Sequence, residues 1–514
     1  LSASALRLDA GQAIGTGTDP LTLSVSELSA LANTGGIFLS ESDDITVSSV
    51  GVTTDKVGAD ATTTPIADGA LSDLQSGSNG SIVLSAGGSI TLDDGDTDGS
   101  VVAAAGSGNI LLDAAGALAL NADVSSGSGN ITLIGTSGVS LASSVTAQTA
   151  GTGTIDVSSL AGGLTMATDS SITALDGDVV VETSEDVRVA GITTNADVSL
   201  TSTAGSILDN QADRINVSAS SLRFDANTGF GASSNAFDTQ VGTVAGRTID
   251  GAVFLQDSAD DLIIGSTQAS SEVVAADSSI TVNAVAALSG IVTGGADASI
   301  VVTQTTGSIN SIAPVSAAGS GNILLDAAGA LALNADVSSG SGNITLIGTS
   351  GVSLASSVTA QTAGTGTIDV SSLEGGLTMA TDSSITALDG DVVVETSADV
   401  RVAGITTNAD VSLTSTAGSI LDNQADRINV SASSLRFDAN AGFGASSNAF
   451  DTQVGTVAGR TIDGAVFLQD SADDLIIGST QASSEVVAAD SSITVNAVAP
   501  LSGIVTGGAD ASIV

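Results

Sequence analysis

Three aspartates at alternate positions are the residues of this chain best suited to bind a metal ion. The run DGDTDG at residues 94–99 matches D-x-D-x-D-G, the opening of a calcium-binding loop. Its alternate carboxylates can converge on a hard cation, and glycine permits the tight turn. Ala105 stands at the twelfth position, where such loops carry a bidentate acid. Asp94, Asp96 and Asp98 are therefore candidate ligands for loosely bound calcium, and a plain acidic surface turn is the favoured alternative.

A second group of acids recurs along the chain. Its members are Asp257, Asp260 and Asp261, then Asp470, Asp473 and Asp474, and in a more divergent form Glu41, Asp43 and Asp44. We interpret them as solvated turns, and loose binding of divalent cations is the alternative. Added calcium or magnesium is expected to promote lateral association of molecules through these acids more than sodium does, because divalent ions screen negative charge more strongly.

The composition excludes most other chemistry. The 514 residues include no Cys, His, Trp or Tyr, and ten Lys plus Arg stand against 56 Asp plus Glu, giving a net charge of −46. A Ser-His-Asp triad, a thiolate nucleophile and an ordinary zinc or haem site are thus impossible. Phosphate recognition by counterion release is implausible for so acidic a chain. The sequence predicts no enzyme, no catalytic residues, no cofactor and no nucleic-acid partner, and no apolar run is long enough for a transmembrane helix.

The chain is dominated by a repeat. Residues 317–514 reproduce residues 104–301 at an offset of 213, and four of the 198 positions differ. The differing pairs are Ala161 and Glu374, Glu185 and Ala398, Thr228 and Ala441, and Ala287 and Pro500. The domain prediction is a divergent partial repeat (1–103), a complete repeat (104–316) and a truncated repeat (317–514), all in one continuous solenoid. The four differences are expected to lie outside the buried ladders, because an unpaired buried glutamate costs several kcal/mol.

Short runs with alternating apolar residues recur within each repeat and indicate strands with one buried face. The first inward residues are predicted to be Ile110, Ile131, Ile155, Val179, Val198, Leu222, Val253, Ile280 and Ile300. This register gives nine rungs of 19–31 residues per repeat and about 22 rungs in the chain. Such a pattern predicts an all-β parallel solenoid, in which equivalent strands pair from rung to rung about 4.8 Å apart.

The longest rung, which begins at Leu222, contains or borders all the aromatic residues of the complete repeat. Asn235 is a candidate N-cap for a short helix in which Phe237, Val241 and Val244 share one face. We expect this segment to form a lid over its own rung. A projecting ligand-binding excursion is the alternative.

Two stretches carry a resemblance to a known family. GSGNITLIGTSGVSLASSV and FDTQVGTVAGRTIDGAVFLQDSADDLIIGS resemble the repeat regions of filamentous-haemagglutinin-like proteins, which are giant bacterial surface and secreted adhesins. The resemblance implies a right-handed parallel β-helix located outside the cell or on the surface of a bacterium.

These features together predict a structural function. The expected role is a non-enzymatic, rod-like segment of a giant extracellular surface or filament protein that gives mechanical reach and surface coverage. The alternative is an adhesin module that binds a ligand of a partner or host cell through the long rungs or the lateral faces. The expected partners are copies of the protein itself and such a cell-surface ligand. We also expect a piece of a longer chain, because the sequence starts at Leu1 and ends within an alternating run at Val514.

Overall fold

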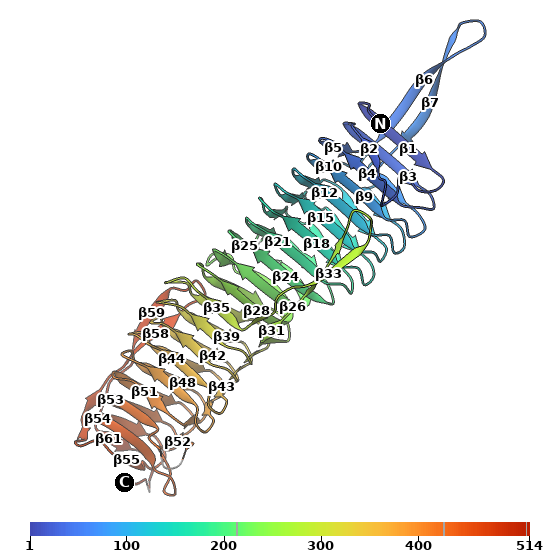
Figure 1. Ribbon diagram of the computed structural model, residues 1–514. Helices are drawn as coiled ribbons and strands as arrows, with labels where there is room; N and C mark the ends of the chain where they lie inside the picture. The colour runs from blue at the N-terminus through green and yellow to red at the C-terminus, as the bar shows by residue number, and fades with distance from the viewer. Residues whose placement is uncertain (212–213, 425–426, 510) are drawn as a thin grey trace. The chain divides into compact units, whose positions relative to one another are not determined.

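The computed structural model describes residues 1–211, 214–424, 427–509 and 511–514 (Figure 1). The chain divides into two compact units. Unit 1 comprises Leu1–Asn227 and Gln268–Ala287, and unit 2 comprises Thr228–Thr267 and Leu288–Val514. The described residues contain no helix, and their parallel strands stack in β-solenoid turns, about 20 in the chain, consistent with a right-handed parallel β-helix. Accordingly, none of the described segments is a helix able to cross a membrane.

Three ladders of parallel strands build unit 1. Ladder A consists of β4 (Ile37–Glu41), β9 (Ile82–Ala86), β12 (Ile110–Ala114), β15 (Ile131–Gly135), β18 (Ile155–Ser159), β21 (Val179–Thr183), β24 (Asp197–Ser202) and β26 (Val217–Ala226). Ladder B consists of β5 (Ile45–Val47), β10 (Ile90–Leu92), β13 (Leu118–Leu120), β16 (Val139–Leu141), β19 (Leu164–Met166), β22 (Val187–Val189) and β25 (Ser206–Asp209). Ladder C consists of β3 (Glu27–Ala32), β8 (Leu74–Ser76), β11 (Ser100–Ala104), β14 (Asp123–Ser126), β17 (Thr146–Thr149), β20 (Ser171–Ala174), β23 (Ile192–Thr193) and the start of β26. Two further strands, β1 (Ala5–Ala10) and β2 (Leu21–Leu23), pair with β3 and β4.

The core of unit 1 lies between these ladders. Ile110 pairs with Ile131, and Ile131 with Ile155, so identical side chains stack in consecutive turns. Val179 and Val198 continue the same column, and all five are fully buried. Medium-sized aliphatic side chains at every turn fill the interior at normal protein density. The predicted register is confirmed over this stretch.

Unit 2 has the same plan. Ladder A includes β29 (Val253–Asp257), β36 (Ile300–Gln304), β39 (Ile323–Ala327), β42 (Ile344–Gly348), β45 (Ile368–Ser372), β48 (Val392–Thr396) and β51 (Asp410–Ser415). Ladder B includes β30 (Asp261–Ile264), β37 (Ser308–Ser311), β40 (Ala330–Leu333), β43 (Gly351–Leu354), β46 (Leu377–Met379), β49 (Val400–Val402) and β52 (Ile420–Asp422). Ladder C includes β28 (Phe237–Thr248), β35 (Ile291–Thr293), β38 (Val315–Ala317), β41 (Val337–Ser339), β44 (Thr359–Thr362), β47 (Ser384–Ala387) and β50 (Ile405–Thr406). The last turns are formed by β53 (Val430–Ala439), β54 (Phe450–Thr461), β55 (Leu468–Asp470), β56 (Ile476–Ile477) and β61 (Ile504–Thr506).

One predicted rung is wrong. Ile280 lies in β33 (Ile280–Ala284), which pairs antiparallel with β32 (Ser270–Val274) and is exposed along its whole length. Val253 instead pairs directly with Ile300, the next inward residue of the solenoid. The segment between them leaves the ladder as a hairpin, so the repeat has one turn fewer at this position than predicted. Alternation alone could not reveal this, because the residues of the exposed strand β33 show the same period of two as a strand with one buried face.

The predicted helix is also wrong. Asn235 makes a bridge with Ala232, and Phe237 begins the long strand β28. Phe230 and Phe237 are fully buried in the solenoid interior, as are the equivalent Phe443 and Phe450, whereas Phe254 belongs to a separate buried cluster with Val487 of the second hairpin. Phe437 stacks on Phe443 with ring centroids 3.9 Å apart, and Phe443 lies 4.5 Å from Phe450. Burial of the phenylalanine rings inside a solenoid turn favours strands here, although Phe237, Val241 and Val244 are spaced for one face of a helix.

The phenylalanine-rich turn of unit 2 also changes the ladder register. Leu435 pairs with Val457. The predicted register, carried over by the 213-residue offset, would pair it with Val466, the first inward residue of the next rung. Val466 instead bridges Phe443, which in turn bridges Ile420 of ladder B. Strands after this turn are therefore shifted to the neighbouring face of the solenoid, and the large rings fill the cross-section where the shift occurs.

The four differences between the repeat copies lie outside the buried ladders, as predicted. Glu374 and Glu185 are exposed and lie in turn-like segments. The other residues at these positions, namely Ala161, Ala398, Thr228, Ala441, Ala287 and Pro500, are exposed or partly exposed. The repeat joints fall inside strands: residues 103 and 104 belong to β11 and residues 316 and 317 to β38. The single continuous solenoid through all three segments stays a prediction.

Candidate functional site

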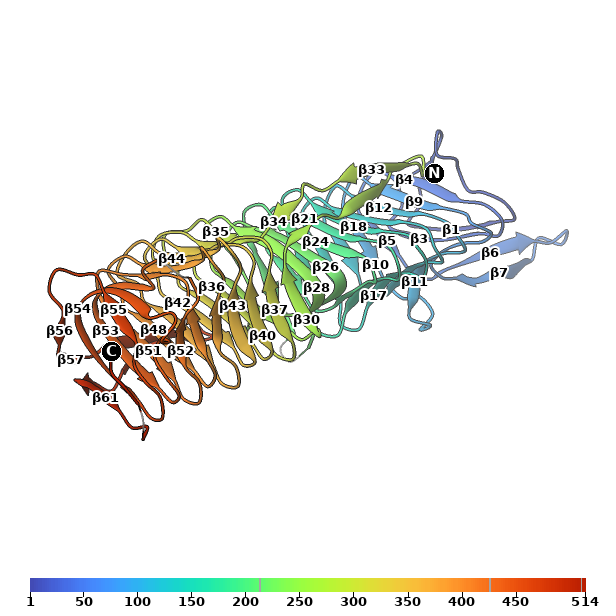
Figure 2. The same ribbon diagram turned by 90° about the horizontal axis from the view of Figure 1, so that it is seen from below.

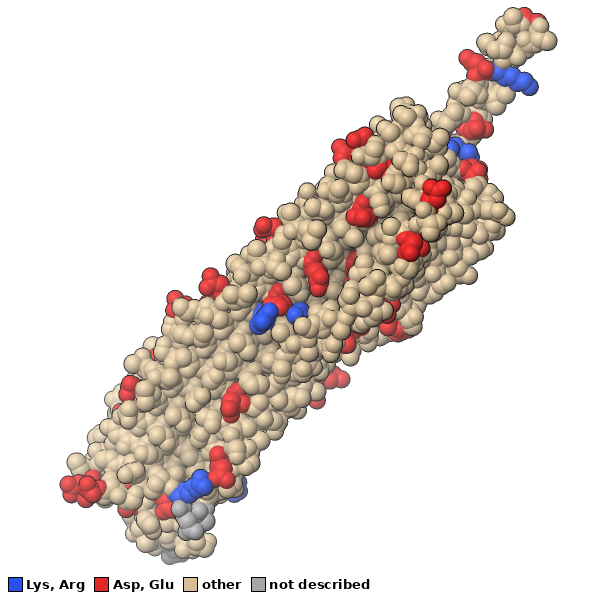
Figure 3. All heavy atoms as spheres, in the orientation of Figure 1, with Lys and Arg blue, Asp and Glu red and all other residues tan. Residues whose placement is uncertain are grey.

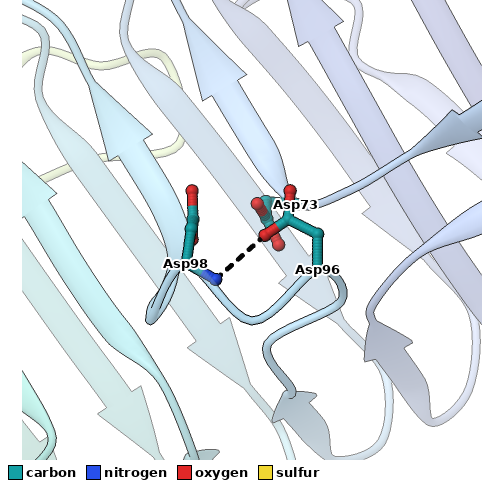
Figure 4. A group of neighbouring side chains, drawn as sticks. All are labelled: Asp73, Asp96 and Asp98. Atoms are coloured by element: carbon teal, nitrogen blue, oxygen red, sulfur yellow. Dashed lines mark hydrogen bonds between the residues drawn. The ribbon is translucent and has the colours of Figure 1, made fainter.

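The structure brings two of the three predicted calcium ligands together with an acid that the sequence did not single out. Carboxylate oxygens of Asp73, Asp96 and Asp98 lie within 4.8 Å of one another (Figure 4). Asp73 comes directly before β8, and the other two lie in the loop before β11. Because β8 and β11 pair in parallel, with Leu74 opposite Val102, the three acids come from successive turns of unit 1.

Asp94 has a different role from the one predicted. Its Oδ1 accepts the backbone N–H groups of Asp96, at 3.0 Å, and of Thr97, at 2.7 Å. Its Oδ2 accepts the N–H of Gly99 at 2.9 Å. These hydrogen bonds hold the pKa of Asp94 below its usual value, although partial desolvation opposes them. Asp94 thus shapes the loop from which Asp96 and Asp98 extend and is not part of the cluster itself.

Asp73 is the unusual member of the cluster. Its side chain is fully buried, and its Oδ1 atom has no hydrogen-bond partner. The Gln75 amide donates to its Oδ2 at 3.5 Å. Burial, followed by repulsion from Asp96 and Asp98, raises the pKa of Asp73 to about 6, while bonds from Gln75 and the Gly95 backbone act in the opposite direction.

A second feature of unit 1 is the flank hairpin, defined as residues 268–287 with strands β32 and β33. Figures 1 and 2 show it lying along the outside of the unit 1 turns. Val274 packs on Val83 and Leu111, which point outward from ladder A, and Val285 with Ala269 packs on Val180. The hairpin therefore buries an outer face that would otherwise meet water.

Polar contacts fix the flank hairpin to consecutive turns. The N–H of Val274 donates to Thr132 Oγ1 at 2.9 Å, and the N–H of Ser270 donates to Asp178 Oδ2 at 2.7 Å. At its end, Arg223 Nε donates to the Ala286 carbonyl at 2.8 Å. These three polar side chains come from ladder strands β15 and β26 and from the residue just before β21.

Asp156 is the most buried acid beneath the hairpin. It accepts hydrogen bonds from Ser271 Oγ, from Thr154 Oγ1 and from the N–H of Glu272 at 3.2 Å. Desolvation nevertheless raises its pKa to about 6, with a smaller contribution from Glu182. Its hydrogen bonds with Ser271 and Glu272 link ladder strand β18 to the hairpin.

Unit 2 repeats this arrangement with the hairpin of residues 481–500, whose strands are β58 (Ser483–Val487) and β59 (Ile493–Ala497). Asp369 accepts from Ser484 Oγ at 2.6 Å and from the N–H of Glu485 at 3.1 Å, and burial raises its pKa to about 6. Arg436 Nε donates to the Ala499 carbonyl at 2.8 Å. The flank hairpin is thus a property of the repeat.

The recurrent acid cluster is not uniformly solvated. Asp257 is fully buried and accepts from Thr239 Oγ1 at 2.8 Å, from the N–H of Val241 at 3.0 Å and from Gln304 Nε2 at 2.9 Å. Burial raises its pKa. Asp260 and Asp261 are exposed, as predicted for turn acids. Asp257 therefore organises the start of a turn and is unavailable to cations at the surface.

Several arginines pair with acids, and not all of these pairs lie on the surface. Arg188 contacts Asp186 at 2.7 Å on the surface, whereas Arg223 is buried and contacts Asp225 at 3.2 Å. Figure 3 shows Asp and Glu spread over the visible face with few Lys or Arg among them.

Comparisons with known proteins give no relative. No family model, no curated protein and no solved structure matches the chain.

Proposed function

We propose that the chain is a non-enzymatic structural segment of a giant extracellular surface or filament protein, serving mechanical reach and surface coverage. One observation carries the proposal: the two near-identical copies build the same ladders and the same docked flank hairpin. In each copy, buried aspartate and arginine side chains are used to fasten the hairpin to the turns. Duplication of such a unit adds length and surface with no new chemical site.

The composition supports a non-enzymatic role, because a chain without Cys or His cannot build a Ser-His-Asp triad or a thiolate nucleophile. Two hollows of unit 2 have a polar lining: one of about 680 Å³ includes Arg427, Asn448 and Asp451, and one of about 540 Å³ includes Glu374 and Asp399. The location outside a bacterial cell rests on the family resemblance of the repeat sequences.

Surface digestion of intact cells tests the proposal. An antibody raised against the 514-residue chain would follow the protein in the bacterium that encodes it, before and after treatment of whole cells with a protease. A cytoplasmic protein serves as the control. Loss of the signal with the control intact is expected, together with antibody labelling outside the envelope in electron micrographs. A signal protected until the cells are lysed would overturn the proposal.

One observation favours the adhesin alternative. Ile280 and Val282 of β33 are exposed, and Ile493 and Val495 repeat the same apolar face in unit 2. Labelled chain added to partner or host cells would bind through this face. Aspartate at both Val282 and Val495 would then abolish binding, whereas equal binding by the doubly substituted chain would exclude these faces as the adhesive surface.

A further inference from the structure

The acids Asp73, Asp96 and Asp98 occupy a defined place in unit 1, at the edge where one turn follows another. Asp73 stands between the exposed hairpin β6–β7 (Val50–Val57 and Thr63–Leu71) and strand β8. The loop that carries Asp96 and Asp98 enters β11, the strand paired with β8. A ligand held by all three would link two consecutive turns at the base of that hairpin.

The Asp73 carboxylate is buried with one oxygen lacking any hydrogen-bond partner, and the hydrogen bond from Gln75 to its other oxygen is long, at 3.5 Å. Taking a charged carboxylate out of water costs several kcal/mol unless hydrogen bonds or an opposite charge compensate. Its Oδ1 atom is buried and accepts no hydrogen bond, and the charged groups beside it are the like-charged Asp96 and Asp98. A bound cation would supply the opposite charge that compensates the burial of this carboxylate.

Comparison with the later repeat shows that the backbone does not require an aspartate here. In unit 2, β35 and β38 correspond to β8 and β11, and the residue before β35 is Gly290. Asp73 and Gly290 have the same left-handed backbone conformation, with φ of 72° and 75°. Glycine adopts this conformation without strain, whereas a residue with a Cβ does so at a cost. The corresponding loop before β38 is Ile312-Ala313-Pro314, without any acid. Unit 1 therefore carries a buried acid at a position suited to glycine, and it carries the facing acids as well.

The loop is preorganised for ligand binding. Asp94 fixes its backbone, the N–H of Asp98 donates to Asp96 Oδ1 at 3.2 Å, and the N–H of Ser100 donates to Asp98 Oδ1 at 2.8 Å. The last two bonds engage one oxygen of Asp96 and one oxygen of Asp98. Figure 4 shows the carboxylate of Asp96 lying against that of Asp73, with Asp98 on the neighbouring part of the loop.

We propose that Asp73, Asp96 and Asp98 form a calcium-binding site that joins two successive solenoid turns. All the ligand atoms are oxygens, which hard cations prefer, and the exposed side of the cluster leaves room for coordinating water. Calcium binds oxygen at about 2.4 Å, so that ligands on opposite sides of the ion are about 4.8 Å apart. Magnesium needs about 4.1 Å and a stricter octahedron. The three carboxylates come from two separate turns, and the flexible geometry of calcium accommodates such a ligand set more readily than the strict octahedron of magnesium.

Titration calorimetry on the whole chain tests this proposal with calcium and magnesium chlorides as the probes. The unsubstituted chain is expected to bind one calcium ion with a Kd on the order of 10⁻⁴ M, typical of extracellular modules. Asp73→Gly is expected to weaken this binding at least tenfold. The matched control is Asp297→Asn, which also removes one negative charge but from an exposed turn of unit 2, and it should bind calcium like the parent.

A stability measurement separates loss of the site from misfolding. Because glycine suits the backbone at position 73, the Asp73→Gly chain in the presence of a chelator should melt no lower than the parent chain. Calcium should raise the melting temperature of the parent and of the Asp297→Asn chain, with little effect on Asp73→Gly at the same concentration. Equal calcium affinity in the parent and Asp73→Gly chains would overturn the site, and equal affinity for magnesium would overturn its assignment to calcium.

Discussion

Asp156 and Asp369 are buried acids whose ionisation opposes the docking of the flank hairpins. Each has a native pKa of about 6, against an ordinary value of 3.8, because burial disfavours the charged form. At a pH between these two pKa values, each of the two carboxyl groups has lost its proton in the unfolded chain but still holds it in the native chain. Raising the pH through this window therefore lowers the free energy of unfolding, and the loss is complete above the native pKa.

We predict that the parent chain loses stability between pH 4 and pH 7 at these two positions. A shift of roughly two pH units corresponds to about 3 kcal/mol per group as an upper limit. Substituting both Asp156→Asn and Asp369→Asn removes the ionisation, so the difference in melting temperature between parent and variant should change in favour of the variant as the pH rises. Circular dichroism melts at fixed ionic strength measure it. A difference that stays constant from pH 4 to pH 7 would contradict the assigned pKa values.

At the scale of elements, the flank hairpin packs on the solenoid turns through one apolar face. Val274 is buried against Val83 and Leu111, whereas Val282 on the partner strand is 62% exposed. The two valines provide a matched pair, because the same substitution introduces a charge into a buried contact in one case and into water in the other.

We predict that Val274→Asp releases the hairpin of unit 1 and leaves the ladders folded. The buried charge lacks a partner and costs several kcal/mol, more than the packing of a small hairpin can offset. Hydrogen exchange followed by mass spectrometry should show faster exchange in residues 270–284 with unchanged protection of β15 and β18. Val282→Asp is the control and should exchange like the parent chain. Protection of 270–284 that survives in Val274→Asp would show that polar contacts alone hold the hairpin.

The elements differ in how far the sequence predicts them. The column from Ile110 through Val198 follows from alternation and repeat spacing alone, because each inward residue meets its counterpart one turn later. The same reasoning fails at Ile280, because alternation does not distinguish a strand that pairs with the next turn from a strand that pairs with the other strand of a hairpin. The outward residues Leu111 and Asp156 appear as ordinary surface positions in the sequence, and only the docked hairpin makes them part of a buried face.

The sequence predicts only part of the candidate metal site. The alternating acids drew attention to Asp96 and Asp98, but Asp73 is an isolated acid 21 residues before the motif and enters the site through the pairing of β8 with β11. One sequence signal existed: where the first segment carries Asp73, the later repeats carry Gly290 and Gly503. The role of Asp94 follows from loop geometry, which spacing does not determine.

At the scale of the whole molecule, charge is the dominant unbalanced property. The net charge is −46, and several of the few arginines are already paired with nearby acids, as Arg188 is with Asp186 and Arg401 with Asp399. Repulsion among the remaining acids lowers the stability of the folded chain at low ionic strength, and dissolved salt screens it over distances of about 10 Å at 0.1 M.

Two responses to salt should therefore be separable in one experiment. Sodium chloride is expected to raise the melting temperature of the parent and Asp73→Gly chains equally, because the substitution removes one of 56 acids and screening acts on all of them. At matched ionic strength, submillimolar calcium should add a further rise in the parent chain alone, through the site at Asp73, Asp96 and Asp98. Higher calcium should increase light scattering by both chains as exposed acids such as Asp260 and Asp261 bridge neighbouring molecules. Identical melting and scattering in sodium and calcium would mean that the acidic surface serves solubility only, since a bound ion and a bridged pair of molecules both require the divalent charge.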